Sequence, residues 1–339
     1  MTSLVDISKL STFGLNGRPQ SIHHLKSREN ILDFMNKIEE QRFLVIGSGS
    51  NVIFGNITDL PLARMEILGV EIEKEDEEGV VINVGAGENW DQFVNWSVSK
   101  NLSGLEALSA IPGTVGASPI QNIGAYGSEA KDSIAEVEAY DTKIGQFIKI
   151  KNKDCGFGYR DSIFKKNPSR FIIVQVTFRL HSIRDRRKSV KIPDYKDVKN
   201  YLNEINNLTP TLQEVRNVVI EIRKNKLPDP KVVPNCGSFF KNVFVSKNVA
   251  KKIKTKFPDV PMFEQDKLIK IPAGYLIDSL GFKGQRINNI EVYKNNALVL
   301  TNPHKASFSD LLSAKETIQK AVFQKFGIKL ELEVNIITK

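Results

Sequence analysis

Short apolar runs separated by glycine-rich turns fill the first half of the chain. Runs of this length between turn residues predict strands, here at residues 42–47, 51–54, 66–72, 80–84, 134–141 and 146–150. The run at 171–180 carries Ile172, Ile173, Val174 and Val176, which is typical of a buried strand. One helix is clear in this half, at 89–101, because Trp90, Phe93, Val94 and Val98 fall on one face.

The second half alternates between helices and strands. Helical patterns lie at 209–226, with a threonine cap, at 246–257, and at 307–327, with Ser307 as the cap and Gly327 as the stop. Alternation at 329–336 predicts a closing strand. Charge density rises between residues 184 and 207, where we expect a linker or excursion. The pattern as a whole predicts an α+β protein.

Composition limits the classes that need to be considered. The chain has 339 residues, 41% of them hydrophobic, and no apolar run approaches the roughly 18–20 residues of a membrane helix. The start of the chain shows no secretion signal. Cys155 and Cys236 fit neither a zinc site nor a disulfide framework, so we expect a cytoplasmic, reduced protein without a metal centre.

The net charge of +9 fits three kinds of partner: nucleic acid, a membrane surface or an anionic small molecule. The densest basic stretches, at 184–191 and 251–256, contain no interleaved aromatic residues, which weakens the case for single-strand binding. A solvated face is the simpler interpretation of both.

Three glycine-rich turns are the candidate ligand-binding segments. Gly47–Asn51 is not a dinucleotide fingerprint, since a strand follows it, but it could form an anion-binding nest as well as an ordinary β-turn. The turn at 84–90 opens a helix and could hold phosphate or simply connect strand and helix.

The third stretch, IPGTVGASPIQNIGAYG at 111–127, is uncharged over its whole length. Glycines let a backbone approach a ligand closely. Ser118, Gln121 and Asn122 add neutral hydrogen-bonding groups, and Tyr126 adds an aromatic ring with a polar tip. Together the three turns suggest a large, flat, phosphorylated ligand, with a structural crossover as the alternative.

An ordered set of motifs runs through almost the whole chain. The set is STFG at 11–14, GSGSNVIF at 47–54, VGAGENW at 84–90, the 111–127 stretch, CGFGYRDSIFK at 155–165, KLPDPK at 226–231, GSFFKN at 237–242 and LELEV at 330–334. It resembles the UDP-N-acetylenolpyruvoylglucosamine reductase family, in its longer type I form, which carries an excursion with Tyr195.

The resemblance implies an FAD-binding fold of the vanillyl-alcohol-oxidase (PCMH) type in two subdomains, with a C-terminal α+β substrate-binding domain. We expect the FAD-binding domain at 17–182, split near 78, an excursion at 183–208, the substrate domain at 209–328 and a closing strand at 329–339. It also implies NADPH as hydride donor, UDP-N-acetylglucosamine enolpyruvate as substrate, and a role in peptidoglycan synthesis. We expect a monomer that binds no nucleic acid and does not insert into a membrane.

The resemblance also implies the roles of particular residues around FAD. The cofactor contacts would be Gly47, Ser48, Gly49, Ser50, Asn51, Ser118, Gln121, Asn122, Gly124 and Arg223. The substrate contacts would be Tyr126, Tyr195, Lys226, Asn242 and Asn296.

Three residues would carry the chemistry. Arg160, in GYRDS, would stabilise the enolate formed when a hydride adds to C3, since its fork matches a carboxylate; an Arg–Asp surface pair is the alternative. Ser238, in GSFFKN, would donate the proton to C2. Alternation puts Glu331 and Glu333 on one face, and only the family motif selects Glu333, acting as a buried, protonated acid.

This sequence departs from the family pattern in four places: Leu332 and Val243 replace prolines, Cys236 replaces a small residue, and Asn296 stands where Gln or His is common. None of these removes a catalytic side chain. Two other classes are weighed against the reductase. A different flavin oxidase would not need Ser238 and Glu333 in these contexts, and a basic nucleic-acid-binding protein would explain the charge alone.

Overall fold

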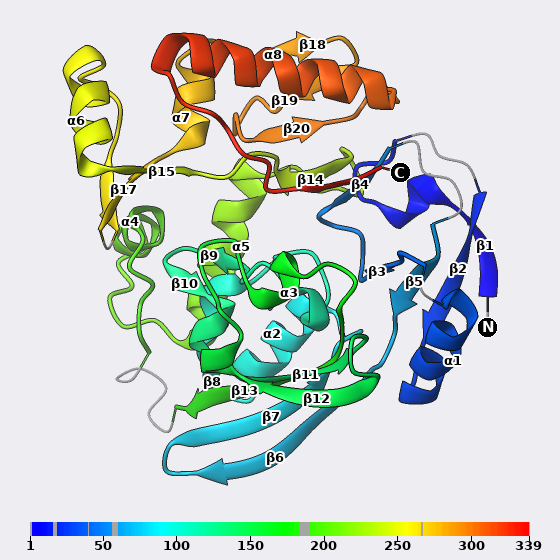
Figure 1. The fold of residues 1–339 in the computed structure, drawn as a ribbon. Coiled ribbons are helices and arrows are strands. Elements are labelled where there is room, and N and C mark those ends of the chain that lie inside the picture. Colours follow the sequence, from blue (N-terminus) through cyan, green and yellow to red (C-terminus); the bar gives the residue numbers. More distant parts are fainter. Residues whose placement is uncertain are drawn as a thin grey trace. The chain divides into compact units, whose positions relative to one another are not determined.

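A computed structural model describes residues 2–15, 19–39, 41–55, 60–183, 190–265 and 267–338. The chain forms two compact units (Figure 1). Unit 1 comprises Met1–Val5, Gln20–Ser48 and Asp59–Lys224, and unit 2 comprises Asp6–Pro19, Gly49–Thr58 and Asn225–Lys339.

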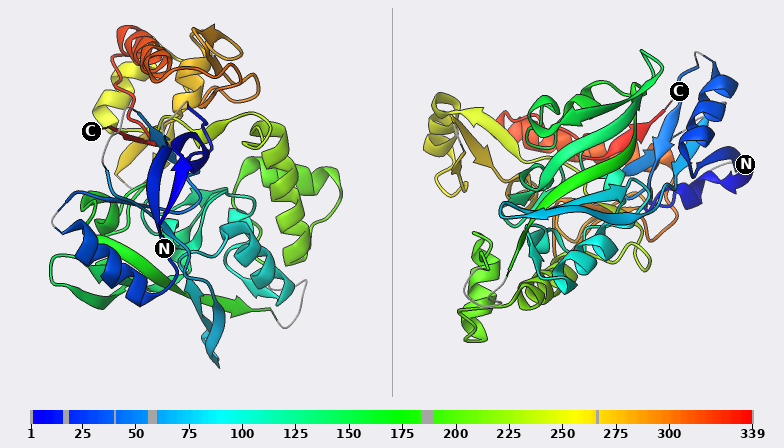
Figure 2. Two further views of the ribbon diagram at one scale, coloured as in Figure 1. Left: turned by 90° about the vertical axis from the view of Figure 1, so that its right-hand side faces the viewer. Right: turned by 90° about the horizontal axis from the view of Figure 1, so that it is seen from below.

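The main sheet of unit 1 is antiparallel and has the strand order β12-β11-β13-β7-β6. Its strands are β6 (Val70–Asp76), β7 (Gly79–Gly85), β11 (Ile134–Asp141), β12 (Gln146–Lys151) and β13 (Phe171–Ser182), and β8 (Leu102–Ser103) pairs with the end of β13. Figure 2 shows these long strands running side by side. The buried run that the sequence places at 171–180 is the central strand, as expected. The strand predicted at 66–72 is wrong in its first half, because β6 begins only at Val70.

Helix α2 (Trp90–Ser99) covers this sheet and confirms the predicted apolar face. The rings of Trp90 and Phe93 lie 6.0 and 5.0 Å from that of Phe178 on β13. Burying three aromatic side chains in one contact stabilises the layer strongly, since aromatic residues contribute the largest apolar areas in a core.

A smaller sheet in unit 1 has the order β1-β2-β5-β3, with β2, β5 and β3 parallel. Its strands are β1 (Thr2–Asp6), β2 (Pro19–Leu25), β3 (Leu44–Ile46) and β5 (Leu62–Met65). Helix α1 (Arg28–Ile38) lies beside it in both views (Figures 1 and 2) and buries Ile31, Phe34 and Ile38. Sequence analysis missed this helix, although a Ser27 cap and the spacing of its apolar residues indicate it.

The predicted excursion contains a packed helix. Helix α4 (Lys196–Glu204) buries Val198 and Leu202 against Val218, Val219 and Ile222 of α5 (Leu212–Lys226). A capping box of Thr211 and Glu214 starts α5, so the predicted threonine cap is present, but the helix begins at Leu212 and not at residue 209. Residues 184–189, which include most of the first basic stretch, lie outside the described residues.

The division between the units differs from the expected borders. It falls at 224/225, because α5 packs on unit 1, and the segments 6–19 and 49–58 belong to the C-terminal unit. The start of the expected FAD-binding domain, residue 17, lies outside the described residues. Long-range packing of this kind leaves no local mark in the sequence.

The described residues of unit 2 form two antiparallel sheets, three α-helices and the parallel pair of β4 (Val52–Phe54) and β21 (Asn335–Ile337). One sheet has the order β14-β20-β19-β18 and the other β15-β17-β16. The strands are β14 (Asn235–Ser238), β15 (Val243–Ser246), β16 (Phe263–Gln265), β17 (Leu268–Ile271), β18 (Arg286–Ile287), β19 (Ile290–Val292) and β20 (Val299–Thr301). The helices are α6 (Lys247–Lys256), α7 (Ala273–Asp278) and α8 (Phe308–Phe326), and Ser307 and Gly327 cap α8 as predicted.

The closing strand is shorter than the sequence suggests. Regular pairing is limited to β21 (Asn335–Ile337), which runs parallel to β4 (Val52–Phe54). Leu332 makes only an isolated bridge to Phe240, and Glu333 lies in a bend. The remaining short elements are η1 (Ile7–Leu10), η2 (Glu106–Leu108), η3 (Val115–Ala117), β9 (Gly124–Ala125), β10 (Ser128–Glu129), η4 (Ala130–Asp132), η5 (Asn152–Asp154) and α3 (Ile163–Lys166).

Gly49 is expected to tolerate no side chain. It has φ +73°, and a Cβ there would lie 1.9 Å from the Leu10 carbonyl oxygen. Left-handed strain costs an alanine about 1–2 kcal/mol, and overpacking against backbone adds about 1–3 kcal/mol. We predict that Gly49→Ala lowers the free energy of unfolding in urea by about 2–5 kcal/mol.

Gly281 provides the matched control, because it has φ +77° but nothing within 4 Å of a Cβ. Gly281→Ala should therefore show the strain alone, about 1–2 kcal/mol. Equal losses in the two variants would mean that contact with Leu10 contributes nothing at Gly49.

Candidate active site

The glycine-rich turns of unit 1 pack directly on one another. A Cβ at Gly47 would lie 2.3 Å from Thr114 Oγ1, and a Cβ at Gly116 would lie 2.5 Å from the Cβ of Ala86. The Gly116 amide donates to the Ala86 carbonyl at 2.9 Å. The three segments selected from the sequence therefore meet, and glycine is needed where their backbones touch.

Most amides of the turn at 84–90 already donate to backbone carbonyls. The N–H groups of Gly85, Ala86, Gly87 and Glu88 donate to the carbonyls of Gly69, Val174, Ile67 and Gly85, and that of Trp90 donates to Gly113. The Asn89 side chain also caps α2 by accepting from Gln92. Of the two interpretations of this turn, these bonds favour the structural connection.

The turn beginning at Gly47 is different. Within the described part of the chain, no backbone carbonyl accepts a hydrogen bond from the amides of Gly47, Ser48 or Gly49. Gly49 has the left-handed conformation that an anion-binding nest requires. This contrast favours the turn at Gly47 over the turn at 84–90 as the phosphate-binding segment.

Tyr126 lies at the tip of a tight hairpin formed by β9 and β10. Tyr126 and Gly127 have φ +51° and +83°, the left-handed pair of a type I′ turn. Asn or Gly normally occupies the first of these positions, so a tyrosine there is strained. Its ring meets that of Tyr195 edge-on, with centroids 5.2 Å apart.

Arg160 is also held in a left-handed conformation, with φ +52°, in a turn closed by a bridge between Gly158 and Asp161. Its Nη2 donates to the Gly124 carbonyl at 2.7 Å. The Ser162 hydroxyl donates to the Ile120 carbonyl at 2.5 Å. Strain in a non-glycine residue persists only where its surroundings enforce it, and such residues concentrate at functional sites.

Three of the predicted FAD contacts have structural partners in unit 1. Asn122 is buried; its Nδ2 donates to Glu129 at 2.9 Å and to the Gly158 carbonyl at 3.1 Å, and its Oδ1 accepts from the Lys131 amide. The Ser118 hydroxyl donates to the Val115 carbonyl at 2.7 Å. Gln121 accepts from Lys165 at 3.3 Å. Their contact with a cofactor stays a prediction, but their role in shaping the loop is visible.

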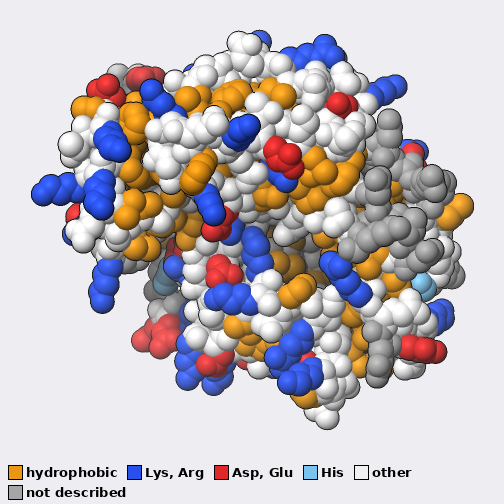
Figure 3. All heavy atoms as spheres, turned by 45° about the horizontal axis from the view of Figure 1, so that its top comes forward, with side chains coloured by type: hydrophobic (Ala, Val, Ile, Leu, Met, Phe, Trp, Pro, Cys, Tyr) orange, Lys and Arg blue, Asp and Glu red, His pale blue; other side chains and the backbone are white. Residues whose placement is uncertain are grey.

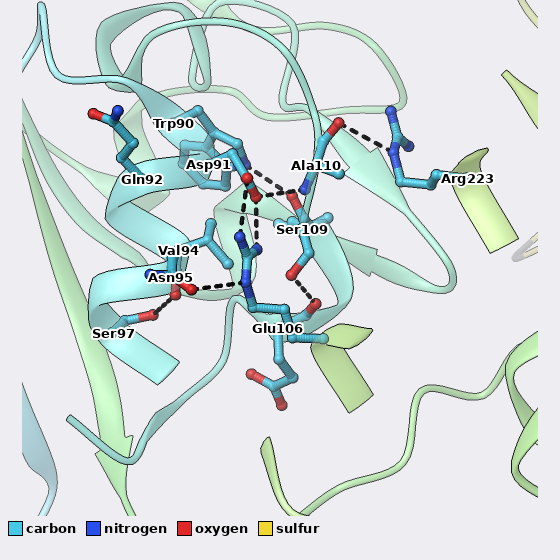
Figure 4. Close-up of polar contacts among 12 residues, drawn as sticks. Trp90, Asp91, Gln92, Val94, Asn95, Ser97, Glu106, Ser109, Ala110 and Arg223 are labelled. Carbon is cyan, nitrogen blue, oxygen red and sulfur yellow. Dashed lines mark hydrogen bonds and ion pairs between the residues drawn. The ribbon is translucent and has the colours of Figure 1, made fainter. Parts of the chain in front are cut away.

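Sequence analysis missed a polar network that includes Ala110, the residue directly before the 111–127 stretch (Figure 4). Asp91 on α2 accepts two hydrogen bonds from Arg216 on α5, at 2.6 and 2.9 Å, and a third from the Ala110 amide at 2.6 Å. The Ala110 carbonyl accepts from Arg223 Nε at 3.2 Å. An arginine on the apolar face of a predicted helix was the available signal, since Arg216 lies among buried Leu212, Val215 and Val219.

In unit 2 the segment that follows Ser238 pairs with the segment that contains Glu333. Ser238 ends β14, opposite Val299 on β20. The following residue, Phe239, accepts a hydrogen bond at its carbonyl from the Glu333 amide at 2.9 Å. Two segments almost 100 residues apart in sequence thus pair through their backbones, and each contains or adjoins a predicted catalytic residue.

The two glutamates that alternation cannot separate have different surroundings. Glu331 is exposed and pairs with Lys241, with 3.4 Å between Nζ and Oε2. Glu333 is half-buried, and its carbonyl accepts from Asn51 Nδ2 at 3.3 Å. The pairing uses the amides of Lys241 and Glu333 and not that of Leu332, so leucine or proline can occupy position 332.

The predicted substrate contacts of unit 2 lie around the same strands. The Asn242 Oδ1 accepts from the Ala273 amide at the start of α7. The Asn296 Oδ1 accepts from the Leu298 amide in the turn before β20. The neighbouring Asn295 donates to the Asn225 carbonyl, which places Lys226, at the end of α5, beside that turn.

The donor set of these turns fits a flavin dinucleotide. A diphosphate is bound well by backbone amides and hydroxyl groups, and the turn at Gly47 contains the three amides without a described carbonyl partner together with the Ser48 hydroxyl. Gly47–Asn51, with Ser118, Gln121, Asn122, Gly124 and Arg223, are the residues that would hold FAD.

Comparison with known proteins agrees with this fit. Residues 19–151 match the family model described as FAD binding domain. Residues 229–337 match the model described as UDP-N-acetylenolpyruvoylglucosamine reductase, C-terminal domain. The fold and site thus define an FAD-binding oxidoreductase.

The relatives identify the family. The UDP-N-acetylenolpyruvoylglucosamine reductases of Flavobacterium johnsoniae and Pseudomonas aeruginosa are each 39% identical to the chain, covering 98% and 96% of both proteins. The crystal structure of the Thermus caldophilus reductase aligns with a TM-score of 0.68 over 100% of this chain and 99% of its own, at 23% identity, which supports the fold. The chain belongs to the UDP-N-acetylenolpyruvoylglucosamine reductase family.

Proposed function

We propose that the protein reduces UDP-N-acetylglucosamine enolpyruvate to UDP-N-acetylmuramate, with FAD as bound cofactor and NADPH as hydride donor. The observation that supports the proposal is that the backbone of residues 239–241, directly after Ser238, pairs with residues 331–333 in unit 2, as expected if Ser238 and Glu333 serve one site. When bound, FAD supplies a carrier that takes up a hydride from NADPH and delivers it to a carbon atom of the substrate.

The protein's own residues account for the charge and the proton. Hydride addition at C3 of the enolpyruvyl group moves an electron pair toward C2 and the carboxylate. The Arg160 guanidinium would stabilise that charge, and Glu333 would polarise the carboxylate. The Ser238 hydroxyl makes no hydrogen bond to another described residue, and it would donate its proton to C2.

The other two classes of protein, a different flavin oxidase and a basic nucleic-acid-binding protein, explain fewer of the observations. A different flavin oxidase would not require a C-terminal domain that matches residues 229–337 to this reductase family. A basic nucleic-acid-binding protein would be expected to gather its positive charge. On the face shown in Figure 3, Lys and Arg side chains are instead scattered among acidic and apolar ones. The net charge suits a substrate and a nucleotide donor that are both polyanions.

The proposal places the enzyme in the cytoplasm as a monomer. Both cysteines are free and buried, as a reducing compartment favours, and burial raises the pKa of Cys155 to about 12. Among the described residues, no helix is long and apolar enough to cross a membrane.

An absorption spectrum of the purified protein tests the proposal. We expect a flavin band that bleaches with NADPH under anaerobic conditions and returns when UDP-N-acetylglucosamine enolpyruvate is added. Bleaching without return would reject the substrate and keep the flavoprotein. No flavin after reconstitution with FAD would reject the proposed function.

A further inference from the structure

The Asp91 and Arg216 side chains form more hydrogen bonds than are needed to join helices α2 and α5. The Arg216 side chain is 7% exposed, and its Nε donates to Asn95 at 3.2 Å in addition to its two bonds with Asp91. A buried arginine with a bidentate carboxylate is fixed in direction as well as in charge. The pair therefore holds the Asp91 carboxylate in one position, and the carboxylate in turn holds its other hydrogen-bond partners.

Asp91 also contacts Ala110, which has φ +57°. Alanine is strained in this region, so neighbouring bonds must hold it there. Its amide is held by the Asp91 carboxylate and its carbonyl by Arg223, one bond on each side of the strained residue. The left-handed conformation aims the amide at α2 and the carbonyl at α5.

Arg223 lies seven residues after Arg216 on α5, which puts both on one face of the helix. Its side chain is half-buried, and its guanidinium lies close enough to the Tyr126 hydroxyl for each group to affect the pKa of the other; the Tyr126 ring packs on a cluster of the same helix that includes Ile222. Tyr126 in turn meets the Tyr195 ring at the tip of the β9–β10 hairpin.

The pKa values of Asp91 and Arg223 reflect the same series of contacts. Burial raises the pKa of Asp91, but the hydrogen bonds from Arg216 and the Ala110 amide, with the charges of Arg216 and Arg223, outweigh it, so the pKa lies below its usual value. Burial lowers the pKa of Arg223, and Tyr126 and Asp91 oppose that shift. Asp91 therefore interacts with Arg223 as well as with its direct partner.

We propose that Asp91 and Arg216 are a positioning pair for Tyr126 and Arg223. The pair locks Ala110 in its left-handed conformation, and the Ala110 carbonyl then holds the Arg223 guanidinium against the Tyr126 hydroxyl. Neither Asp91 nor Arg216 needs to touch a ligand. Their effect on substrate binding rests on the proposed function, whereas their effect on Tyr126 does not.

Nuclear magnetic resonance of the protein labelled with ¹³C at tyrosine Cζ tests the proposal without a substrate. The Tyr126 signal is assigned by its absence in Tyr126→Phe. We expect Asp91→Asn to shift this signal, because the amide of asparagine cannot accept from Arg216 through two oxygens and hold Ala110 as well. Asp141→Asn is the matched control, since it breaks another bidentate Arg–Asp pair, with Arg170, in the same unit, and should leave the signal in place.

Two further variants make the test specific. Glycine adopts positive φ without strain, so Ala110→Gly added to Asp91→Asn should return the Tyr126 signal part of the way to its wild-type position. A role in global stability alone would show no such rescue. If Asp91→Asn does not fold, Arg216→Lys carries the same test, because lysine keeps the charge and loses the fork.

The outcomes separate the two proposals. An unmoved Tyr126 signal in Asp91→Asn, or in Arg216→Lys if that variant is used, overturns the positioning role even if the enzyme is a reductase. A shifted signal in a protein that lacks reductase activity supports positioning and rejects the proposed function. In an active reductase we expect Asp91→Asn to raise the substrate KM about tenfold, with a smaller change in kcat.

Discussion

Ser238→Ala is expected to leave FAD bound and its reduction by NADPH unchanged, and to slow reoxidation by the enolpyruvyl substrate by about 10²- to 10⁴-fold. The physical reason is that the hydroxyl supplies only the proton for C2, which is needed after the first half-reaction is complete. Stopped-flow absorption of the flavin band separates the two half-reactions. The pairing of Phe239 with Glu333 uses backbone groups, so the alanine variant keeps the geometry of the site.

Two other serine variants make the result specific. Ser238→Cys replaces the hydroxyl by a more acidic group and should recover part of the rate. Ser279→Ala removes a hydroxyl of unit 2 that donates only to the Leu276 carbonyl, and it should reoxidise at the wild-type rate. An unchanged reoxidation rate in Ser238→Ala would show that another group donates the proton.

Arg160→Ala is expected to lower the rate of the same half-reaction by about 10²- to 10³-fold, the range found when one group that stabilises an oxyanion is removed. Arg160→Lys should lose less, because it keeps a positive charge but not the fork that matches a carboxylate. Single-turnover reoxidation measures both. FAD affinity should change little, since the bonds from Asn122 to Gly158 and from Ser162 to Ile120 still hold the loop.

Arg170→Lys is the control for these variants. Arg170 is a second arginine of unit 1 with a bidentate carboxylate partner, Asp141, and it has no predicted contact with substrate. Its reoxidation rate should equal that of the wild type. A loss of FAD in Arg160→Ala equal to the loss of rate would assign Arg160 to the loop and not to the chemistry.

The local sequence pattern was enough to predict the larger helices and strands of the fold. The apolar face of α2, the buried strand β13 and both ends of α8 follow from spacing, β-branching and capping residues, which act within a few residues of one another. The predicted closing strand was too long, because the alternating residues at 329–334 form only one isolated bridge and a bend.

The candidate site was predicted unevenly. Motifs selected Arg160, Ser238 and Glu333, and their roles stay predictions until the variants are measured. Alternation could not separate Glu331 from Glu333, but the ion pair of Glu331 with Lys241 distinguishes them. Asp91 and Arg216 were missed, because a carboxylate in a first helical turn and an arginine 125 residues later give no sign that they meet.

The backbone segments that could approach a ligand, and the side chains that carry acid, base or charge, can be recognised without the fold. Those properties reside in single residues, such as the glycine at position 49 and the guanidinium at position 160. Only the tertiary fold shows that the Gly47 amide has no carbonyl partner among the described residues while the Gly85 amide has one, and why Ala110 and Tyr126 are held at positive φ. Hydrogen bonds between distant segments set these features, and a linear sequence does not record which segments become neighbours.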